Sequence, residues 1–350
     1  MWNYYQRFLN CLVYVLVFVC FLSLACVAPA DDTEKTLKEA RSIADPYVFD
    51  FVSWEVEVFS AAIIDVFMVK HGEDREIVLR NQIRSVLKEY DLVLFPPLNF
   101  SLEKPPHLLV VSPRERIEYM DRILLRQYLT IEEKEQIEGQ VDQLGISSLV
   151  TEIGGLGATV PPIVTDDASI EFIINAIVEE WLHQYLTFRP LGFLYVLDLI
   201  GFRQHPDIAT MNESLAGLVS KEIGDEVYRR YYDENAGVED KEIGCTFDFR
   251  EEMRITRSNT DKFLAEGNIE KAERYMEARR RLFELNGYNI RKLNQAYFAF
   301  HGIYGYDPAS VSPMYEDLKQ LRERSISLKH FLDRTADMTS YADLKRALEE

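Results

Sequence analysis

Cysteine is scarce in the part of the chain that could fold into a body. Three of the four cysteines, Cys11, Cys20 and Cys26, lie in or beside one apolar run near the start, and Cys245 is the only one after it. An internal disulfide or a cysteine-ligated zinc site is therefore excluded from the body. A metal site would have to use carboxylates and some of the six histidines.

Positive charge is also in short supply. The chain has 39 lysines and arginines against 58 aspartates and glutamates, which gives a formal net charge of −19. Proteins that bind nucleic acid need clustered basic residues to displace counterions from phosphates. The composition therefore argues against nucleic acid as a partner and against an anionic lipid surface. Because 47% of the residues are hydrophobic, the chain can still bury a large core, and we expect it to be globular.

Long apolar runs are absent except at residues 8–30, where about 20 apolar positions are enough for a helix that spans a bilayer. Arg7 precedes the run and three acidic residues follow it within 31–34, which favours a cytoplasmic N-terminus and an external body. Three fates remain open: an uncleaved anchor, a signal peptide cleaved after Ala30, or a lipoprotein modified at Cys26. We favour the anchor, because the run is long for a signal peptide and Ser23 replaces the usual lipobox leucine.

Residues 31–165 combine helical and strand-like patterns. Helices are expected after Pro46 and over 73–90, and strands over 92–95 and 108–112, while 115–143 is charged with a helical period. Residues 147–153 and 160–164 are typical of strands on either side of Gly154-Gly155-Leu156-Gly157. A hairpin or bend explains these glycines better than a phosphate-binding loop, because no Lys-Ser or Lys-Thr pair follows.

From Asp167 onward the pattern is almost entirely helical, and helices are expected over 169–187, 209–232, 249–265, 268–286, 289–303, 313–332 and 340–349. The predicted fold class is therefore α+β and mostly helical, with few strands. We divide the chain into a membrane anchor or signal segment at 1–30, an α/β part at 31–165, and a helical part at 166–350.

The first of these helices carries Glu179, Glu180 and His183 in the order Glu-Glu-x-x-His. A metalloprotease helix reads His-Glu-x-x-His, which puts two imidazoles on a zinc ion and a glutamate beside them as general base. Residues four apart share one helix face, so Glu179 and His183 can bind one ion while Glu180 flanks it. Glu213, on a later helix, could close a three-ligand site.

Together these residues resemble a family of membrane-anchored, gluzincin-like bacterial proteins of largely unassigned function, which are similar to predicted aminopeptidases. The resemblance covers most of residues 90–310 and includes 112–115, 154–157, 189–192 and 291–302. It implies a zincin-like metalloprotease core and a body outside the bacterial cell membrane, held by residues 8–28. It also implies one divalent ion, Zn²⁺ or Mn²⁺, on Glu179, His183 and Glu213. Relatives of this kind usually have histidine at the position of Glu179.

The predicted function is that of a metallopeptidase in which metal-activated water attacks a peptide carbonyl and Glu180 takes the proton. Carboxylate in place of imidazole makes the bound water less acidic and favours harder ions such as Mn²⁺. Asn294, His301 and Tyr304 are the candidate substrate-binding residues. Two alternatives remain: a catalytically inactive relative that binds peptides or scaffolds envelope proteins, and a purely structural, membrane-associated helical protein.

We expect the full-length chain to fractionate with membranes, and a variant without residues 1–30 to be released as a soluble, folded protein. The reason is that no second apolar run in the sequence is long enough to span a bilayer. Fractionation of cells that express either form, followed by immunoblotting, tests this expectation. Recovery of the unprocessed full-length chain in the soluble fraction would contradict the anchor.

Overall fold

The computed structural model describes residues 32–57, 75–92, 95–199, 202, 206–233 and 247–350. The predicted anchor at 8–30 lies outside these ranges, as does most of the helix expected after Pro46, of which residues 51–57 are helical. None of the helices in the described ranges is both long enough and apolar enough to cross a membrane.

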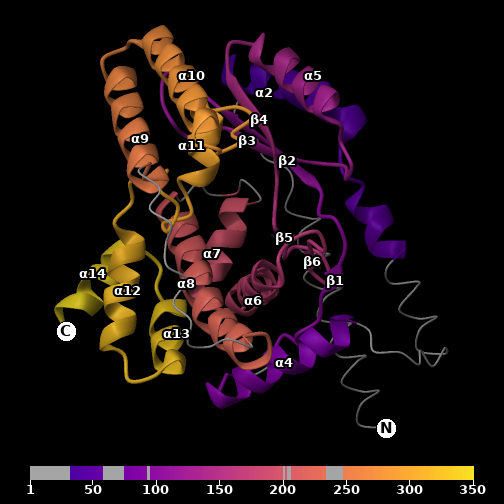
Figure 1. Cartoon of the computed structure of the whole chain (residues 1–350), viewed down its shortest axis with the longest axis vertical. Helices are drawn as coiled ribbons and strands as arrows, with labels where there is room; N and C mark the ends of the chain where they lie inside the picture. The colour runs from indigo at the N-terminus through magenta and orange to yellow at the C-terminus, as the bar shows by residue number, and fades with distance from the viewer. Residues whose placement is uncertain (1–31, 58–74, 93–94, 200–201, 203–205, 234–246) are drawn as a thin grey trace.

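The fold is mostly helical with a few short strands, which confirms the predicted α+β class (Figure 1). The helices are α2 (Asp32–Ala44), α4 (Arg75–Glu89), α5 (Ile131–Asp142), α6 (Ile170–Thr187), α7 (Pro190–Leu199), α8 (Pro206–Tyr231), α9 (Phe249–Ala265), α10 (Ile269–Leu285), α11 (Gln295–His301), α12 (Met314–Arg324), α13 (Leu328–Ala336) and α14 (Tyr341–Glu349). The strands are β1 (Ser101–Leu102), β2 (His107–Ser112), β3 (Asp121–Leu125), β4 (Ser147–Glu152), β5 (Gly155–Leu156) and β6 (Ile163–Val164).

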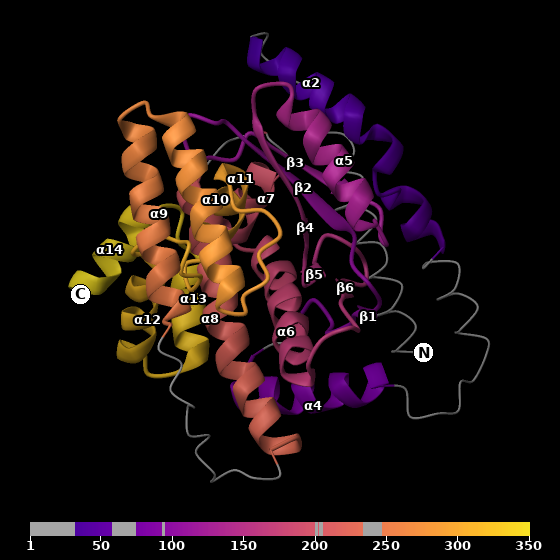
Figure 2. The ribbon, with the colours of Figure 1, turned by 45° about the horizontal axis from the view of Figure 1, so that its top comes forward.

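These strands form two three-stranded sheets. In the larger, β2 is central and pairs antiparallel with β3 and β4. In the smaller, β6 is central, parallel to β1 and antiparallel to β5. Residues 147–153 and 160–164, predicted as strands on either side of the glycines at 154–157, lie in different sheets. Gly155 and Leu156 instead form β5, which pairs antiparallel with β6 as a hairpin. The larger sheet lies under α5 on one side, with α11 packed on β2 and β4 (Figure 2).

Several predicted boundaries are wrong for identifiable reasons. Strand β3 lies inside the charged segment 115–143, because its run of Ile123, Leu124 and Leu125 pairs with β2. The helix expected over 289–303 begins only at 295, where Asn294 caps it by accepting the Tyr297 N–H. The helix expected over 313–332 is two helices, since Ser327 caps a new one at α13. Leu92 and Phe95, the described ends of the expected strand 92–95, lie in no strand.

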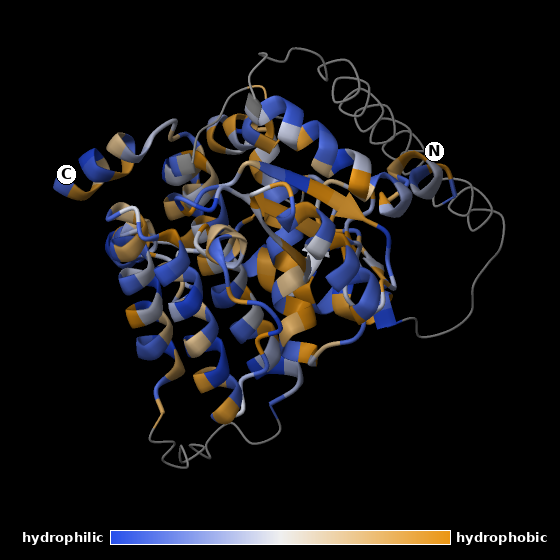
Figure 3. Ribbon diagram, turned by 90° about the horizontal axis from the view of Figure 1, so that it is seen from above, coloured by the Kyte–Doolittle hydropathy of each residue, from blue (hydrophilic) through white to orange (hydrophobic). Residues whose placement is uncertain are grey.

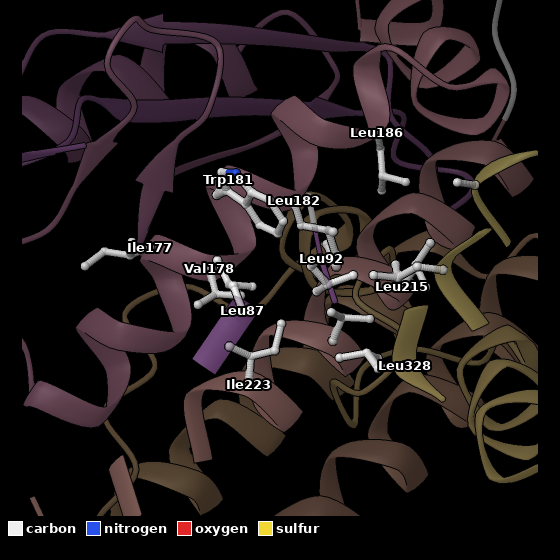
Figure 4. Packing of buried hydrophobic residues seen from close by; sticks show 14 of the residues in the cluster. Leu87, Leu92, Ile177, Val178, Trp181, Leu182, Leu186, Leu215, Ile223 and Leu328 are labelled. Atoms are coloured by element: carbon white, nitrogen blue, oxygen red, sulfur yellow. The ribbon is translucent and has the colours of Figure 1, made fainter. Parts of the chain in front are cut away.

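The largest hydrophobic core surrounds α6, which packs along α8 and against α4. The C-terminal helices close this core, with α12 and α14 packed on α8 and α13 on α7. Trp181, Leu182 and Leu186 of α6 are fully buried (Figure 4). The Trp181 indole N–H also donates to the carbonyl of Pro96 at 2.9 Å, which fixes the ring. Coloured by hydropathy, the centre of the molecule is apolar and the peripheral helices are mainly hydrophilic (Figure 3). The core therefore holds α6 and α8 rigidly against each other.

The outer edge of β4 is closed by side chains instead of another strand. At Val150, the N–H donates to Glu138 at 2.6 Å and the carbonyl accepts from Arg291 at 2.8 Å. Arg291 also forms a two-pronged ion pair with Glu138, whose side chain is only 4% exposed. An unpaired strand edge is a template for association with other chains. The ion pair therefore blocks this edge at Val150.

The same edge is closed at Ser148 by a second set of contacts. Its N–H donates to Asp142 at 2.9 Å, and its carbonyl accepts from the Asn294 amide at 2.8 Å. Lys292 binds the same Asp142 at 2.8 Å. The opposite edge of this sheet, at β3, is partly covered by residues 47–49 through backbone hydrogen bonds. Residues 291–294, which are part of the predicted family block, thus complete the hydrogen bonds along the edge of β4.

Substitution of Arg291 by methionine is expected to lower the free energy of unfolding by about 3 kcal/mol, because the buried Glu138 carboxylate loses its main partner. The matched control is Arg281→Met, which removes an ion pair whose arginine is 70% exposed and which should cost less than about 1 kcal/mol. Urea unfolding of the two variants and the wild type measures the difference. Equal midpoints for both variants would disprove the role assigned to Arg291.

Candidate metal centre

Helices α6 and α8 bring the three predicted ligands together. Glu179 and His183 lie one turn apart on α6, and Glu213 lies on α8, which runs beside α6 (Figures 1 and 2). One ligand atom from each of the three residues lies within 4.8 Å of the other two. In the part of the chain that the structure describes, this is the one group of three or more such side chains that could hold a metal ion.

The imidazole of His183 is oriented by a neighbour on α8. Its Nδ1–H donates to Oδ1 of Asn212 at 2.7 Å, so Nε2 points toward Glu213, whose Oε2 is 3.5 Å away. Asn212 is fully buried, and its Nδ2 has no hydrogen-bond partner among the described residues. A buried donor without a partner costs stability. Metal-binding histidines typically donate their second nitrogen to such an acceptor, which fixes the ring and its tautomer.

Glu213 is held in turn by residues of α7 and β3. The hydroxyl of Tyr195 donates a short hydrogen bond to Oε1 of Glu213, and the Tyr195 ring stacks on His183 with centroids 5.8 Å apart. Arg122 of β3 bonds Asp198 of α7 at 3.3 Å, which ties α7 to the sheet. Oε2 of Glu213 is thereby left free to face His183. Two elements besides the ligand helices, α7 and β3, thus contribute to the orientation of one carboxylate.

The electrostatics of the site show a shortage of positive charge. Burial raises the pKa of Glu179 to about 8 and that of Glu180 to about 7. Burial alone would lower the pKa of His183, but the surrounding carboxylates, Glu213 first, raise it to about 10. Burial acts against ionisation of Glu213, yet His183 and the Tyr195 hydroxyl hold its pKa below the ordinary value. Without a metal ion, protons on His183, Glu179 and Glu180 supply the positive charge that the buried carboxylates lack.

A divalent ion fits this set of donors. Two ligands on a tetrahedral ion with bonds of about 2.1 Å lie about 3.4 Å apart, and the separation of His183 Nε2 and Glu213 Oε2 is 3.5 Å. The side chain of His183 is 16% exposed, so water can reach the ring. Two carboxylates would neutralise the charge of the ion, which would take the place of the proton on His183. The group of Glu179, His183 and Glu213 can therefore hold one metal ion.

Glu180 faces the glycine hairpin instead of the three ligands. Its carboxylate accepts a hydrogen bond from the backbone N–H of Gly157. A Cβ on Gly155 or Gly157 would lie 2.3 Å or 2.6 Å from a carboxylate oxygen of Glu180, so only glycine permits this approach. Gln184, one turn further along α6, donates to the carbonyl of Gly157 at 3.1 Å. The hairpin is thus fastened to the same helix as the ligands, beside the candidate base.

Among the predicted substrate-binding residues, Tyr304 is the one with clear electrostatic coupling to the site. Burial raises its pKa well above the ordinary value, and Glu213 and Glu179 add to the shift. The loop that carries Tyr304 is fixed to α8 by the Gly305 N–H, which donates to Ser214 Oγ at 3.2 Å. Tyr306 of the same loop lies against Gly217, one turn beyond Glu213. Tyrosine hydroxyls in this position stay protonated and can donate hydrogen bonds.

The other two predicted substrate residues are engaged elsewhere. Asn294 caps α11 and bonds the backbone of β4, so both ends of its amide have structural partners. His301 pairs with Asp307 through Nδ1 at 2.9 Å, and its ring packs on Tyr297 with centroids 4.2 Å apart.

The residues that orient the ligands were not found from the sequence. Asn212 was visible as the neighbour of Glu213, and its buried position on α8 gives it a role that the sequence did not assign. Tyr195 and Arg122 carry no motif, and both lie on elements, α7 and β3, that the sequence pattern did not predict. A tyrosine in an apolar segment gives no signal of its partner on another helix. Only the packed structure brings these side chains to Glu213.

Compared with protein-family models, with curated proteins and with solved structures, the chain has no match in any of the three. The resemblance to gluzincin-like proteins therefore stays a prediction. Function is inferred below from the arrangement of Glu179, His183 and Glu213 and from the residues that hold them.

Removal of the Asn212 acceptor is expected to weaken binding of a divalent ion by about 10- to 100-fold, as for other residues that orient metal ligands. Asn212→Leu keeps the size of the side chain but cannot accept from His183, whereas Asn212→Asp keeps the acceptor and should retain affinity. His183→Ala should lose the ion altogether. Competition with a chromophoric chelator measures all four proteins. Unchanged affinity in Asn212→Leu would show that the orientation of His183 is unimportant.

Proposed function

We propose that the protein is a membrane-anchored metallopeptidase with a zincin-like core, and that Glu179, His183 and Glu213 hold its metal ion. The observation that carries the proposal is the convergence of these three side chains on α6 and α8, with His183 already oriented by Asn212. Helical spacing alone explains why Glu179 and His183 lie close together on one face of α6. It does not account for a buried carboxylate from a second helix and a buried asparagine beside it.

The chain's own residues have distinct tasks in this proposal. A divalent ion, when bound, would lower the pKa of a water molecule and polarise a carbonyl. Glu180 accepts the proton of the attacking water and delivers it to the nitrogen of the leaving amine as the peptide bond breaks. In the metal-free protein burial raises its pKa to about 7, and a bound divalent ion would lower that value by favouring the carboxylate. Tyr304, whose hydroxyl stays protonated, is the candidate donor to the developing oxyanion.

Zn²⁺ and Mn²⁺ are the two candidate ions. One imidazole and two carboxylates give a harder ligand set than two imidazoles and one carboxylate, which favours Mn²⁺ relative to the usual zinc site. The absence of cysteine from the ligand set is consistent with either ion. Glu179 must give up its proton to bind, because burial raises its pKa to about 8. We therefore expect weaker binding than at a two-histidine site.

A catalytically inactive, peptide-binding or scaffold protein of the cell envelope is the second candidate. Two observations favour it: Glu179 stands where an imidazole would give a more acidic bound water, and Glu180 is engaged by the Gly157 N–H. In that case Glu180 would serve to fasten the hairpin to α6. The two functions make opposite demands on Glu180, because one needs its proton affinity and the other needs only its acceptor oxygen.

Glu180→Gln is expected to separate these roles, because the amide oxygen can still accept from Gly157 but cannot take a proton. If the protein is a peptidase, hydrolysis of a peptide library should fall by about 10²- to 10⁴-fold while metal occupancy stays close to that of the wild type. The matched control is Glu323→Gln, a glutamate on α12 that lies outside the candidate site. An active Glu180→Gln variant would remove Glu180 as the base.

Glu179→His is expected to strengthen zinc binding and to raise peptide hydrolysis, because it restores the second imidazole. The assay uses wild type and variant with Zn²⁺ and Mn²⁺ supplied separately. If the wild type is inert with both ions and the variant is active, the natural protein has kept a peptidase site without activity. If both are inert across a broad library, the binding or scaffold function replaces the peptidase proposal.

A further inference from the structure

The side chain of Arg122 extends from the larger sheet toward the helices of the metal centre. Arg122 of β3 lies opposite Val110 of β2, which packs in the apolar cluster under α11. Because successive residues of a strand point to opposite faces, Arg122 lies on the α11 face of the sheet. Its neighbour Asp121 lies on the other face, where it pairs with Arg41 of α2. On the α11 face, Arg122 meets Asp198 of α7.

The guanidinium of Arg122 has more N–H groups than its partners use. Its Nη2 donates to Asp198 at 3.3 Å, and none of the described residues accepts from its Nε or Nη1. Nη2 has one hydrogen on the side of Nε and one on the side of Nη1. The contact with Asp198 therefore leaves one edge of the guanidinium with two N–H groups side by side. The side chain is 21% exposed, so a molecule that enters from solvent can reach it.

Two contacts hold this guanidinium in place. Its Cζ lies over the ring of Tyr119, 4.9 Å from the ring centroid, and Asp198 binds one amino group. Tyr119 packs against the cluster under α11, as does Tyr304, the candidate donor to the oxyanion. Burial raises the pKa of the Tyr119 hydroxyl well above its ordinary value, so the ring stays neutral. A fixed, planar guanidinium is suited to binding a carboxylate through two parallel hydrogen bonds.

Arg122 is also close to the metal ligands. Tyr195 and Asp198 are three residues apart on α7, so their contacts with Glu213 and Arg122 are separated by about 5 Å along the helix axis. The pKa of Glu213 stays below its ordinary value despite burial, mainly through His183 and Tyr195 and also through the charge of Arg122. Consecutive Cα atoms of a peptide are about 3.8 Å apart. A carboxylate on the residue next to a bond at the ion would therefore reach Arg122.

We propose that Arg122 binds a carboxylate of the peptide, and that the site selects peptides with a carboxylate on the residue next to the bond at the metal centre. The carboxylate is either a free C-terminus or the side chain of an aspartate or glutamate, because both present the same two oxygens. The inference deepens the proposed function and rests on a peptide as the ligand, whether or not that peptide is hydrolysed. The glutamates around the ion would disfavour an acidic ligand, so the preference depends on Arg122.

The test compares three peptides on the full-length protein in detergent with Mn²⁺. Acetyl-tetra-alanine has a free C-terminus, its C-terminal amide has no charge, and the amide with a final glutamate has a side-chain carboxylate only. Equilibrium dialysis followed by mass spectrometry of the peptides measures binding and any hydrolysis separately. Each measurement is repeated with a chelator, because a carboxylate could also bind the ion itself.

Two variants of Arg122 are compared with a matched control. Arg122→Met removes the charge and the hydrogen bonds, whereas Arg122→Lys keeps a charge beside Asp198 without the planar pair of donors. The control is Arg322→Met, since Arg322 is 23% exposed and pairs with Glu222, further along α8 from Glu213. Thermal unfolding shows which variants are folded. If Arg122→Met does not fold, Arg122→Lys and the three peptides on the wild type still decide the question.

We expect the wild type to bind one of the acidic peptides about 10- to 100-fold more tightly than the neutral amide, the range for hydrogen bonds between charged groups. Which acidic peptide it prefers identifies the source of the carboxylate. Arg122→Lys should lose most of the preference and Arg122→Met all of it, while Arg322→Met keeps it. The preference should also persist with the chelator, because Arg122 and not the ion binds the carboxylate.

Equal binding of acidic and neutral peptides by the wild type would overturn the proposal. A preference that both Arg122 variants retain and that the chelator abolishes would assign the carboxylate to the metal ion, with the same result. Binding of none of the peptides would overturn both this inference and a peptide as the ligand. A protein that hydrolyses nothing but keeps the Arg122-dependent preference would remove the peptidase function and support the role of Arg122.

Discussion

The packing of α6 against α8 is the constraint on which the rest of the structure depends. Burial of Trp181, Leu182 and their neighbours fixes the spacing of the two helices, and the polar residues at the border of this contact have no freedom to move apart. Like charges would separate if they could, because each buried carboxylate costs free energy. Apolar burial therefore supplies the force that holds Glu179 and Glu213 within reach of the His183 imidazole.

Features that depend on one continuous segment could be predicted from the sequence, whereas features that depend on contacts between distant segments could not. The helix over 170–187, its buried face and the shared face of Glu179 and His183 follow from spacing along one segment, and they were predictable. Glu213 was found because a known type of site requires a third ligand. Tyr195 and Arg122 could not be found, since their roles arise from contacts between α7, β3 and α8 that leave no pattern in the sequence.

Two segments differ from their sequence-based predictions for physical reasons. No helix was expected over 190–199, yet Pro190 begins α7, because the first turn of a helix needs no N–H from its first residue. Asn294 suggested a substrate ligand, but both ends of its amide are used by α11 and β4. A polar side chain in a family-like block is equally suited to binding a substrate and to completing backbone hydrogen bonds. Only the position of its partners decides between the two.

The closed edge of β4 has a consequence for how this protein could fail. Newly made chains pass through partly folded states in which open strand edges can recruit one another. Arg291 and Asn294 come late in the chain, whereas the strand they close is complete much earlier. During synthesis the N–H groups at this edge can already bond Glu138 and Asp142, but the carbonyls of Ser148 and Val150 lack their partners until residues 291–294 have been made. A chain truncated before residue 291 would therefore leave these two carbonyls exposed as acceptors for the N–H groups of another chain.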